Sequence, residues 1–142
     1  MDGYGPVRFG QPIAAVSAAL GEPLKPAYRD NETCDYVRPN GLPSGSLLMV
    51  IADTVMRVDV DSGGIPTAEG ARVGDTEASV LDLYKGRVTV QPHKYTGPQG
   101  HYLVVMTPGD TTRALIFETD GKRVVNYRAG KRPAVELVEG CS

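Results

Sequence analysis

The sequence predicts an α+β protein in which two tandem repeats, each a helix followed by antiparallel strands, form one continuous sheet with the helices on one face. Two observations lead to this prediction. Residues 7–16 match residues 71–80 at an offset of 64, with Arg, Gly, Ala and Val repeated in register. Residues 48–60 match residues 115–127 at an offset of 67, in the same order along the chain. Recurring blocks of this kind are typical of repeat architectures.

Each repeat is expected to open with a short strand that ends in glycine and leads into a short helix. Pro12 suits the first turn of the first helix, where its missing N–H costs nothing, and Gly21 suits the end. In the second repeat, Asp75 or Thr76 is expected to cap the helix and Gly86 to end it. The apolar residues at helical spacing are Ile13, Val16, Leu20, Val80, Leu81 and Tyr84.

Extended sequence follows each helix. Asp120-Gly121 predicts a two-residue hairpin turn, and residues 61–66 form the link between the repeats. We therefore assign the first repeat to residues 1–66 and the second to residues 67–142. The predicted strands are 34–37, two strands within 47–61 joined around 52–54, 88–91, 102–106, 113–119 and 122–128.

Alternation along the strands divides their side chains between the two faces of the sheet. The residues expected to face inward are Leu48, Val50, Val58, Val60, Leu115, Phe117, Val125 and Tyr127. The residues expected on the open face, and our candidates for binding a partner, are Arg57, Asp59, Gln91, His93, Tyr95, Glu118, Asn126 and Arg128. Tyrosine and arginine among short polar residues are typical of protein-binding surfaces, and an ordinary solvated sheet face is the alternative.

The only two cysteines, Cys34 and Cys141, allow one pairing. A disulfide would pin the C-terminal tail to the body, and closing so long a loop removes roughly 4–5 kcal/mol of unfolded-state freedom. We expect this disulfide, with two free thiols as the alternative. It favours the periplasm or the cell exterior, with a signal peptide already removed from the chain.

Two segments also carry a resemblance to a known family. Val7-Arg8-Phe9-Gly10 with its helix, and residues 67–76, resemble the tandem-repeat family that includes the β-lactamase inhibitor protein and, as single units, the outer-membrane-assembly lipoproteins of the SmpA/OmlA type. The ending 138–142 resembles uncharacterised exported bacterial proteins. The resemblance implies a continuous concave sheet that grips protein partners. The chain has no tryptophan and no cysteine pair within each repeat, so the resemblance names no particular target.

Motifs that would indicate catalysis or metal binding are weak. His93 and His101 flank a turn without a third zinc ligand beside them, so surface histidines are the simpler interpretation. Residues 59–64 begin like a calcium loop, but Gly63 lacks an oxygen ligand and Gly70 stands where an acidic ligand belongs. Neither a nucleophile elbow nor a phosphate-binding glycine loop occurs. We therefore expect neither an enzyme nor a bound cofactor or metal.

The resulting hypothesis is a periplasmic or secreted protein-binding module, of the inhibitor or immunity type, that acts through the concave face of its sheet. One alternative is a small-ligand or lectin-like glycan-binding protein that uses His93, Tyr95, His101 and Tyr102. Another is an envelope assembly component with a lipid anchor on its precursor. A net charge of −2 argues against a nucleic-acid partner, and the longest apolar run is too short to cross a bilayer.

Overall fold

The computed structural model describes residues 3–30 and 32–141; residues 1, 2, 31 and 142 of the two predicted repeats lie outside the described residues. Within the described part the fold is α+β, with two α-helices, a seven-stranded antiparallel sheet and a separate two-stranded sheet. The elements in chain order are β1 (Gly3–Tyr4), β2 (Val7–Arg8), α1 (Ile13–Leu20), β3 (Cys34–Val37), β4 (Ser46–Ile51), β5 (Thr54–Val60), α2 (Glu77–Leu83), β6 (Val88–Pro92), β7 (His101–Thr107), β8 (Asp110–Thr119), β9 (Val124–Lys131) and the short 3₁₀ helix η1 (Ala134–Glu136).

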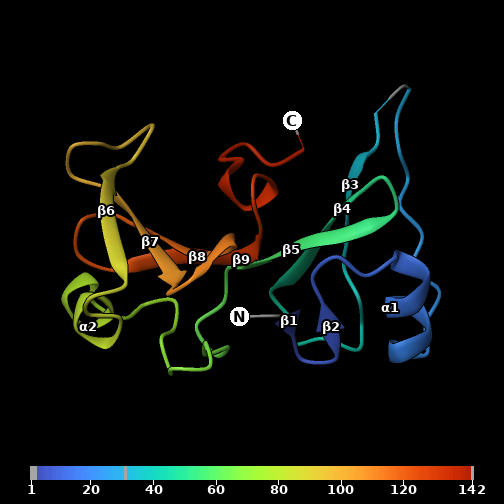
Figure 1. Ribbon diagram of the computed structural model, residues 1–142, viewed down its shortest axis with the longest axis horizontal. Helices are drawn as coiled ribbons and strands as arrows, with labels where there is room; N and C mark the ends of the chain where they lie inside the picture. The colour runs from blue at the N-terminus through green and yellow to red at the C-terminus, as the bar shows by residue number, and fades with distance from the viewer. Residues whose placement is uncertain (1–2, 31, 142) are drawn as a thin grey trace.

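The large sheet has the strand order β3-β4-β5-β9-β8-β7-β6, and each neighbouring pair is antiparallel. The pairing of β5 with β9 joins the strands that precede α2 to those that follow it. Both helices lie on one side of the sheet, at its two ends, and the chain beyond β9 lies on the other side (Figure 1). The sheet is therefore the middle layer, with the two helices on one side at its ends and the C-terminal part of the chain on the other side.

Three of the helix ends follow the local sequence, whereas the prediction that Gly86 ends the second helix was wrong, because α2 ends at Leu83. Pro12 stands immediately before α1, and Gly21 ends it with a left-handed φ of 66°, a conformation that glycine adopts without strain. The Thr76 side chain accepts a hydrogen bond from the backbone N–H of Ser79, so Thr76 is the cap of α2. Both helices are short and depend on the sheet for their stability.

The hydrophobic core lies between the helices and the sheet. Ile13 and Val16 of α1 and Val80 of α2 belong to one cluster with the inward residues of the strands. The predicted inward residues that are buried in this cluster are Leu48, Val50, Val58, Val60, Leu115, Phe117 and Tyr127. The alternation of the strands thus predicted the core face correctly at these positions.

The prediction for Val125 was wrong, because this side chain is 46% exposed. The register of β8 and β9 shifts between Glu118 and Thr119, where Asn126 and Val124 are the successive partners and Val125 is left over. Such a bulge reverses the alternation, so Val124 takes the inward place.

The predicted two-residue turn at Asp120-Gly121 was also too short. The Asp120 carboxylate accepts hydrogen bonds from the backbone N–H groups of Lys122 and Arg123, which keeps both residues in the turn, and β9 begins at Val124. The short strand expected before α2 is absent from the described residues 71–73. Gly74 instead donates its N–H to the carbonyl of Val124.

A second apolar cluster lies on the far side of the sheet, under the C-terminal segment, which we define as residues 132–141. Val135 of this segment packs against Tyr102, Ala114 and Ile116 of β7 and β8. A disulfide between Cys34 and Cys141 joins the end of the segment to β3 across 107 residues of sequence, which confirms the predicted pairing. The C-terminal segment is therefore a packed layer of the fold.

We expect Gly130→Ala to destabilise the protein at the seam between β5 and β9. A Cβ atom at Gly130 would lie 2.3 Å from the carbonyl oxygen of Met56 and 2.4 Å from the Arg57 Cβ, so the two strands would have to separate. The expected loss in the free energy of unfolding is about 1–3 kcal/mol, measured by denaturant titration. Gly64→Ala is the matched control, because nothing lies within 4 Å of its Cβ position. Equal stabilities of the two variants would contradict this reading of the seam.

Candidate functional site

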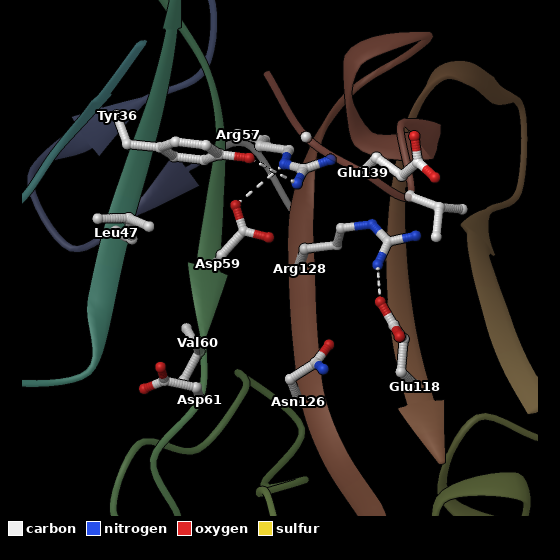
Figure 2. A pocket seen from close by; sticks show the side chains of 12 residues that line it. Tyr36, Leu47, Arg57, Asp59, Val60, Asp61, Glu118, Asn126, Arg128 and Glu139 are labelled. Carbon is white, nitrogen blue, oxygen red and sulfur yellow. Dashed lines mark hydrogen bonds and ion pairs between the residues drawn. The ribbon is translucent and has the colours of Figure 1, made fainter. Parts of the chain in front are cut away.

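The charged residues at the centre of the sheet lie on the face away from the helices. Arg57 and Asp59 stand on β5, and Arg128 stands beside Asp59 on the paired strand β9 (Figure 2). The sequence predicted this face for them but expected it to be open. That expectation was wrong for Arg57 and Arg128, which are each 3% exposed because the C-terminal segment lies over them.

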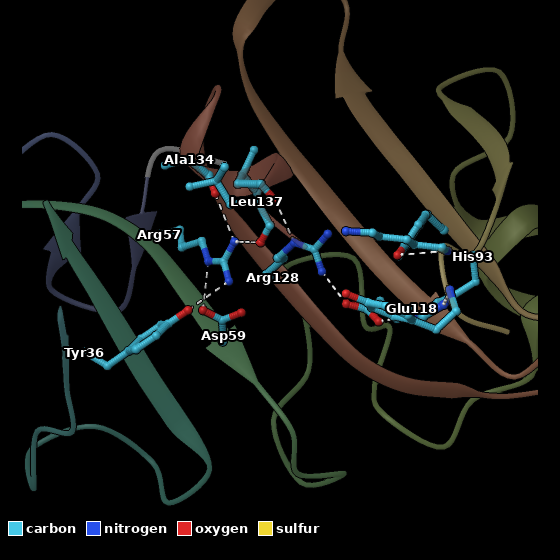
Figure 3. Close-up of polar contacts among 12 residues, drawn as sticks. Tyr36, Arg57, Asp59, His93, Glu118, Arg128, Ala134 and Leu137 are labelled. Carbon is cyan, nitrogen blue, oxygen red and sulfur yellow. Dashed lines mark hydrogen bonds and ion pairs between the residues drawn. The ribbon is translucent and has the colours of Figure 1, made fainter. Parts of the chain in front are cut away.

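Arg57 holds the C-terminal segment through its main chain. Its Nη1 donates to the carbonyl oxygens of Ala134 and Leu137, at 2.9 and 2.8 Å. Its Nε donates to the Asp59 carboxylate at 3.0 Å, and its Nη2 donates to the Tyr36 hydroxyl at 3.2 Å (Figure 3). The guanidinium thus has partners on both sides, as a buried charge requires.

Arg128 repeats this role one strand away. Its Nε donates to the carbonyl oxygen of Val135 at 2.6 Å, and its Nη1 is paired with the Glu118 carboxylate. The other oxygen of Glu118 lies 2.7 Å from the Nε2 of His93. The His93 ring stacks on Tyr102 at a centroid distance of 4.5 Å, so a continuous polar path runs from the C-terminal segment to the end of β6.

The hydrogen bonds of His93 assign its tautomer. Its Nδ1 accepts from the backbone N–H groups of Tyr95 and Thr96, at 3.1 and 3.3 Å. In neutral His93 the proton is therefore on Nε2, which donates to Glu118. His93 orients the Glu118 carboxylate and is held by the loop between β6 and β7.

A cavity of about 400 Å³ opens beside this network, between β4, β5, β9 and the C-terminal segment. Four carboxylates line it, from Asp59, Asp61, Glu118 and Glu139, against the two guanidiniums of Arg57 and Arg128 (Figure 2). Both guanidiniums are already bound to carboxylates and to main-chain carbonyls. The excess charge at the cavity is therefore negative.

Burial raises the pKa of the Asp59 carboxyl, although the Arg57 guanidinium beside it acts in the opposite direction. A folded pKa above the unfolded one means that the folded chain holds this proton at a higher pH. The stability that Asp59 contributes through this proton is fully present below the unfolded pKa and is lost as the pH rises through the folded pKa. We expect the stability of the unmodified chain relative to Asp59→Asn to increase as the pH falls from 7 toward the ordinary value of 3.8. Denaturant titrations at several pH values measure this difference, and a difference that shrank would contradict it.

The rim of the cavity is held by contacts between the C-terminal segment and the loop that follows β6. Tyr95 donates its hydroxyl to the Glu139 carboxylate, and the Lys94 ammonium lies 3.3 Å from the same carboxylate. The hydrogen bond from Tyr95 and the charge of Lys94 lower the pKa of Glu139. Tyr95 is 60% exposed and Leu137 is 43% exposed, so both present apolar surface to solvent. We call these four residues and the cavity beside them the tail-side surface.

The structure brings most of the predicted partner-binding residues to this face. Asp59, His93, Glu118 and Asn126 are partly exposed there. Gln91 is exposed on β6 and lines a separate hollow of about 300 Å³ on the other side of the C-terminal segment, with Arg132 and Glu136. Arg57 and Arg128 are buried, so they hold the C-terminal segment from beneath and hardly contact solvent themselves.

The two histidines lie on different faces of the sheet. His101 at the start of β7 is bound through Nδ1 to the Glu77 carboxylate of α2 at 2.9 Å, on the helix side, whereas His93 faces the C-terminal segment. No group of three or more residues that could hold a metal ion occurs in residues 3–30 and 32–141. In the same part of the chain no helix has the length and apolar character needed to cross a membrane.

Sequence reasoning missed Tyr36, Leu137 and Glu139, which shape the site. Tyr36 alternates correctly with Val37 on β3, so its face was available from the pattern. The residues of the C-terminal segment gave no comparable signal, because the arginines bind their main-chain carbonyls, which every residue type has.

Comparison with known proteins informs only the fold. No protein-family profile and no curated protein sequence matches the chain. The crystal structure of the uncharacterized protein YfeY from Escherichia coli is similar, with a TM-score of 0.52 and 15% sequence identity over 92% of this chain and 97% of that one. The two proteins therefore have a similar fold over nearly their whole lengths.

Proposed function

We propose that this chain is a protein-binding module of the periplasm or the cell exterior, and that it binds its partner through the tail-side surface. The observation that carries the proposal is the exposed pair Tyr95 and Leu137 beside the cavity. Tyr95 is held by its hydrogen bond to Glu139, which lines the cavity, and the backbone of Leu137 is held by Arg57. Aromatic and aliphatic side chains that are fixed before binding lose little entropy on association, which favours them as anchors.

The charge of the cavity specifies the partner's chemistry. Asp61 is exposed at its mouth, and the carboxylates of Asp59 and Glu118 lie deeper. A lysine or arginine side chain of a partner would complement this negative excess, and about 400 Å³ accommodates it. An inhibitor or immunity-type protein that inserts its rim into an enzyme cleft and receives a basic side chain of that enzyme fits this arrangement.

The inference of two tandem repeats gains support from matching contacts around the two helices. Gly10 donates its N–H to the Val55 carbonyl, and Gly74 donates to the Val124 carbonyl. The backbone N–H groups of Val55 and Val124 in turn donate to the carbonyls of Gln11 and Asp75. Gly10 and Gly74 are 64 residues apart, as in the first block of the sequence comparison, whereas Val55 and Val124 are 69 residues apart. The second block therefore needs an offset of 69 in place of 67.

The hairpins also share an irregularity at this corrected offset. The register of β4 with β5 shifts between Met49 and Val50, and that of β8 with β9 shifts between Glu118 and Thr119, again 69 residues on. The strand order is symmetric about the seam of β5 and β9 if β6 is set aside. This supports the resemblance to the architecture of the β-lactamase inhibitor protein.

The disulfide supports the proposed compartment. The bond between Cys34 and Cys141 is consistent with an oxidising, extracytoplasmic environment, since cytoplasmic thiols are kept reduced. A partner is therefore to be sought among periplasmic or secreted proteins.

Affinity capture with a matched pair of variants tests the proposal. The immobilised chain is exposed to a periplasmic or secreted protein fraction of the source organism, beside Leu137→Ala and Leu83→Ala. Leu83 on α2 is the control, because its 45% exposure matches the 43% of Leu137 while it lies on the helix side. We expect a partner that Leu83→Ala retains and Leu137→Ala loses. Capture of no protein, or equal loss in both variants, would count against the tail-side surface.

The two alternatives gain less support. The four residues of the lectin-like hypothesis do not form one site, because His93 and Tyr102 stack on each other and His101 lies on the opposite face. The envelope assembly hypothesis predicts an acylated cysteine on the precursor, which mass spectrometry of the membrane fraction tests directly.

A further inference from the structure

The helix side of the sheet carries a second cavity, at the seam that neither helix covers. The helices pack at opposite ends of the sheet and leave its centre between them (Figure 1). A cavity of about 530 Å³ opens there, within the range of roughly 300–1,000 Å³ that is usual for sites of small ligands. It lies on the opposite side of the sheet from the tail-side surface.

The floor of this cavity is an apolar row across three central strands. Leu115 on β8 is paired with Ala129 on β9, and Ala129 is paired with Val58 on β5. Ala129 is smaller than both neighbours, so the row is lowest at its centre. Gly3 and Gly5, which line the cavity on the side of the β1–β2 turn, add no side chains to fill it.

The rim of the cavity provides one cationic group with donors to spare. Arg87 donates its Nε to the carbonyl of Met106 at 3.4 Å, and its guanidinium lies over the Tyr84 ring. Among the described residues, the terminal nitrogens of Arg87 have one charged partner, Glu69, at 4.0 Å and so beyond hydrogen-bond length. A planar guanidinium with available N–H groups is well suited to a carboxylate.

Glu69 is the carboxylate beside Arg87, and its hydrogen bond is made with Tyr84. Tyr84 donates its hydroxyl to the Oε1 of Glu69 at 3.0 Å and accepts from Thr67, whereas the Oε2 of Glu69 is the oxygen that lies 4.0 Å from Arg87. Burial raises the pKa of Tyr84 to about 12, which keeps this hydroxyl a donor. Tyr127, deeper in the cavity, donates its hydroxyl to the carbonyl of Ile65.

From this arrangement we infer that the seam cavity binds a small amphiphilic carboxylate, with its apolar body on the row formed by Leu115, Ala129 and Val58 and its carboxylate on Arg87. This is a ligand-binding activity separate from the binding of a protein partner. The apolar body gains from burial against the floor, at about 25 cal/mol per Å² removed from water. The carboxylate selects the ligand's orientation.

Titration calorimetry with decanoate tests the inference, with decanol as the neutral control of the same chain length. We expect decanoate to bind the unmodified chain saturably, at one molecule per chain, and decanol to bind more weakly. Arg87→Gln should weaken decanoate binding by about tenfold or more, the loss expected for a charge-assisted hydrogen bond. Glu69→Gln should strengthen it, because a competing carboxylate is removed from Arg87.

Ala129→Leu is the decisive variant, since a leucine at the centre of the row fills the cavity and should abolish binding. Its thermal unfolding shows whether the fold is intact, and Arg87→Gln, at a partly exposed position, tests the site independently if it is not. The inference is overturned if the unmodified chain binds no decanoate, or if Arg87→Gln binds decanoate as tightly as the unmodified chain. Binding that survives in folded Ala129→Leu also overturns it. Neither variant touches the tail-side surface, so partner capture by these variants is expected to be unchanged.

Discussion

Replacing Cys34 and Cys141 by serine is expected to lower the free energy of unfolding by about 4–5 kcal/mol, because the disulfide closes a loop of 107 residues. The serine variant also loses the anchor that keeps the C-terminal segment over Arg57 and Arg128, so its loss exceeds that from chain entropy alone if the segment detaches. Denaturant titration without reductant measures the difference.

The control for this experiment is the unmodified chain in the presence of a reductant. Its unfolding curve should move to that of the serine variant, while the variant itself should not respond to the reductant. A variant as stable as the oxidised unmodified chain would contradict the structural role assigned to this bond.

Arg57→Ala is expected to destabilise the protein by about 3–5 kcal/mol, the usual cost of removing one partner from a buried ion pair. The alanine leaves the Asp59 carboxylate without its guanidinium and the carbonyls of Ala134 and Leu137 without their donor. The exposed residue Arg38 is the matched control, and Arg38→Ala is expected to change the stability by less than about 0.5 kcal/mol.

The pH dependence of Arg57→Ala gives this prediction a second measurement. The Arg57 guanidinium lowers the pKa of Asp59, so its removal raises that pKa further. As the pH falls, Asp59 takes up a proton and no longer needs a cationic partner. The deficit of Arg57→Ala should therefore shrink toward low pH, and a deficit that is independent of pH would place its cause in packing alone.

The parts of the fold that local physics determines were predictable from the sequence. Glycine at 21, threonine at 76 and the alternation of strands 46–51 and 54–60 predicted helix ends and a core face that the structure has. The exception at Val125 follows from a bulge, which adds one residue to one strand and leaves no mark in the alternation itself.

The candidate site was predicted less completely, because its covering layer comes from a distant part of the chain. Outward charged residues on a strand normally meet water, and the pattern around Arg57 and Arg128 gives no reason to expect otherwise. Their burial depends on a segment that they bind through its main-chain carbonyls, a contact that is independent of residue type. Only the penultimate cysteine marked this segment as attached to the body of the fold.

Burial of the two arginines changes how the face is expected to work. The two arginines fix the C-terminal segment in place. The residues proposed to contact a partner are therefore those of this segment and of the loop after β6. Tyr95 is the one predicted contact residue that the structure presents as a largely exposed aromatic side chain. The proposal therefore depends on the rim, where Tyr95 and Leu137 lie, more than on the charges beneath it.

Hydrogen–deuterium exchange of the chain, alone and with the captured partner, tests the tail-side surface most directly. The proposal predicts slower exchange on binding in residues 93–97 and 134–140, with no change in α1 and α2. Slower exchange confined to the two helices, with residues 93–97 and 134–140 unaffected, would contradict it.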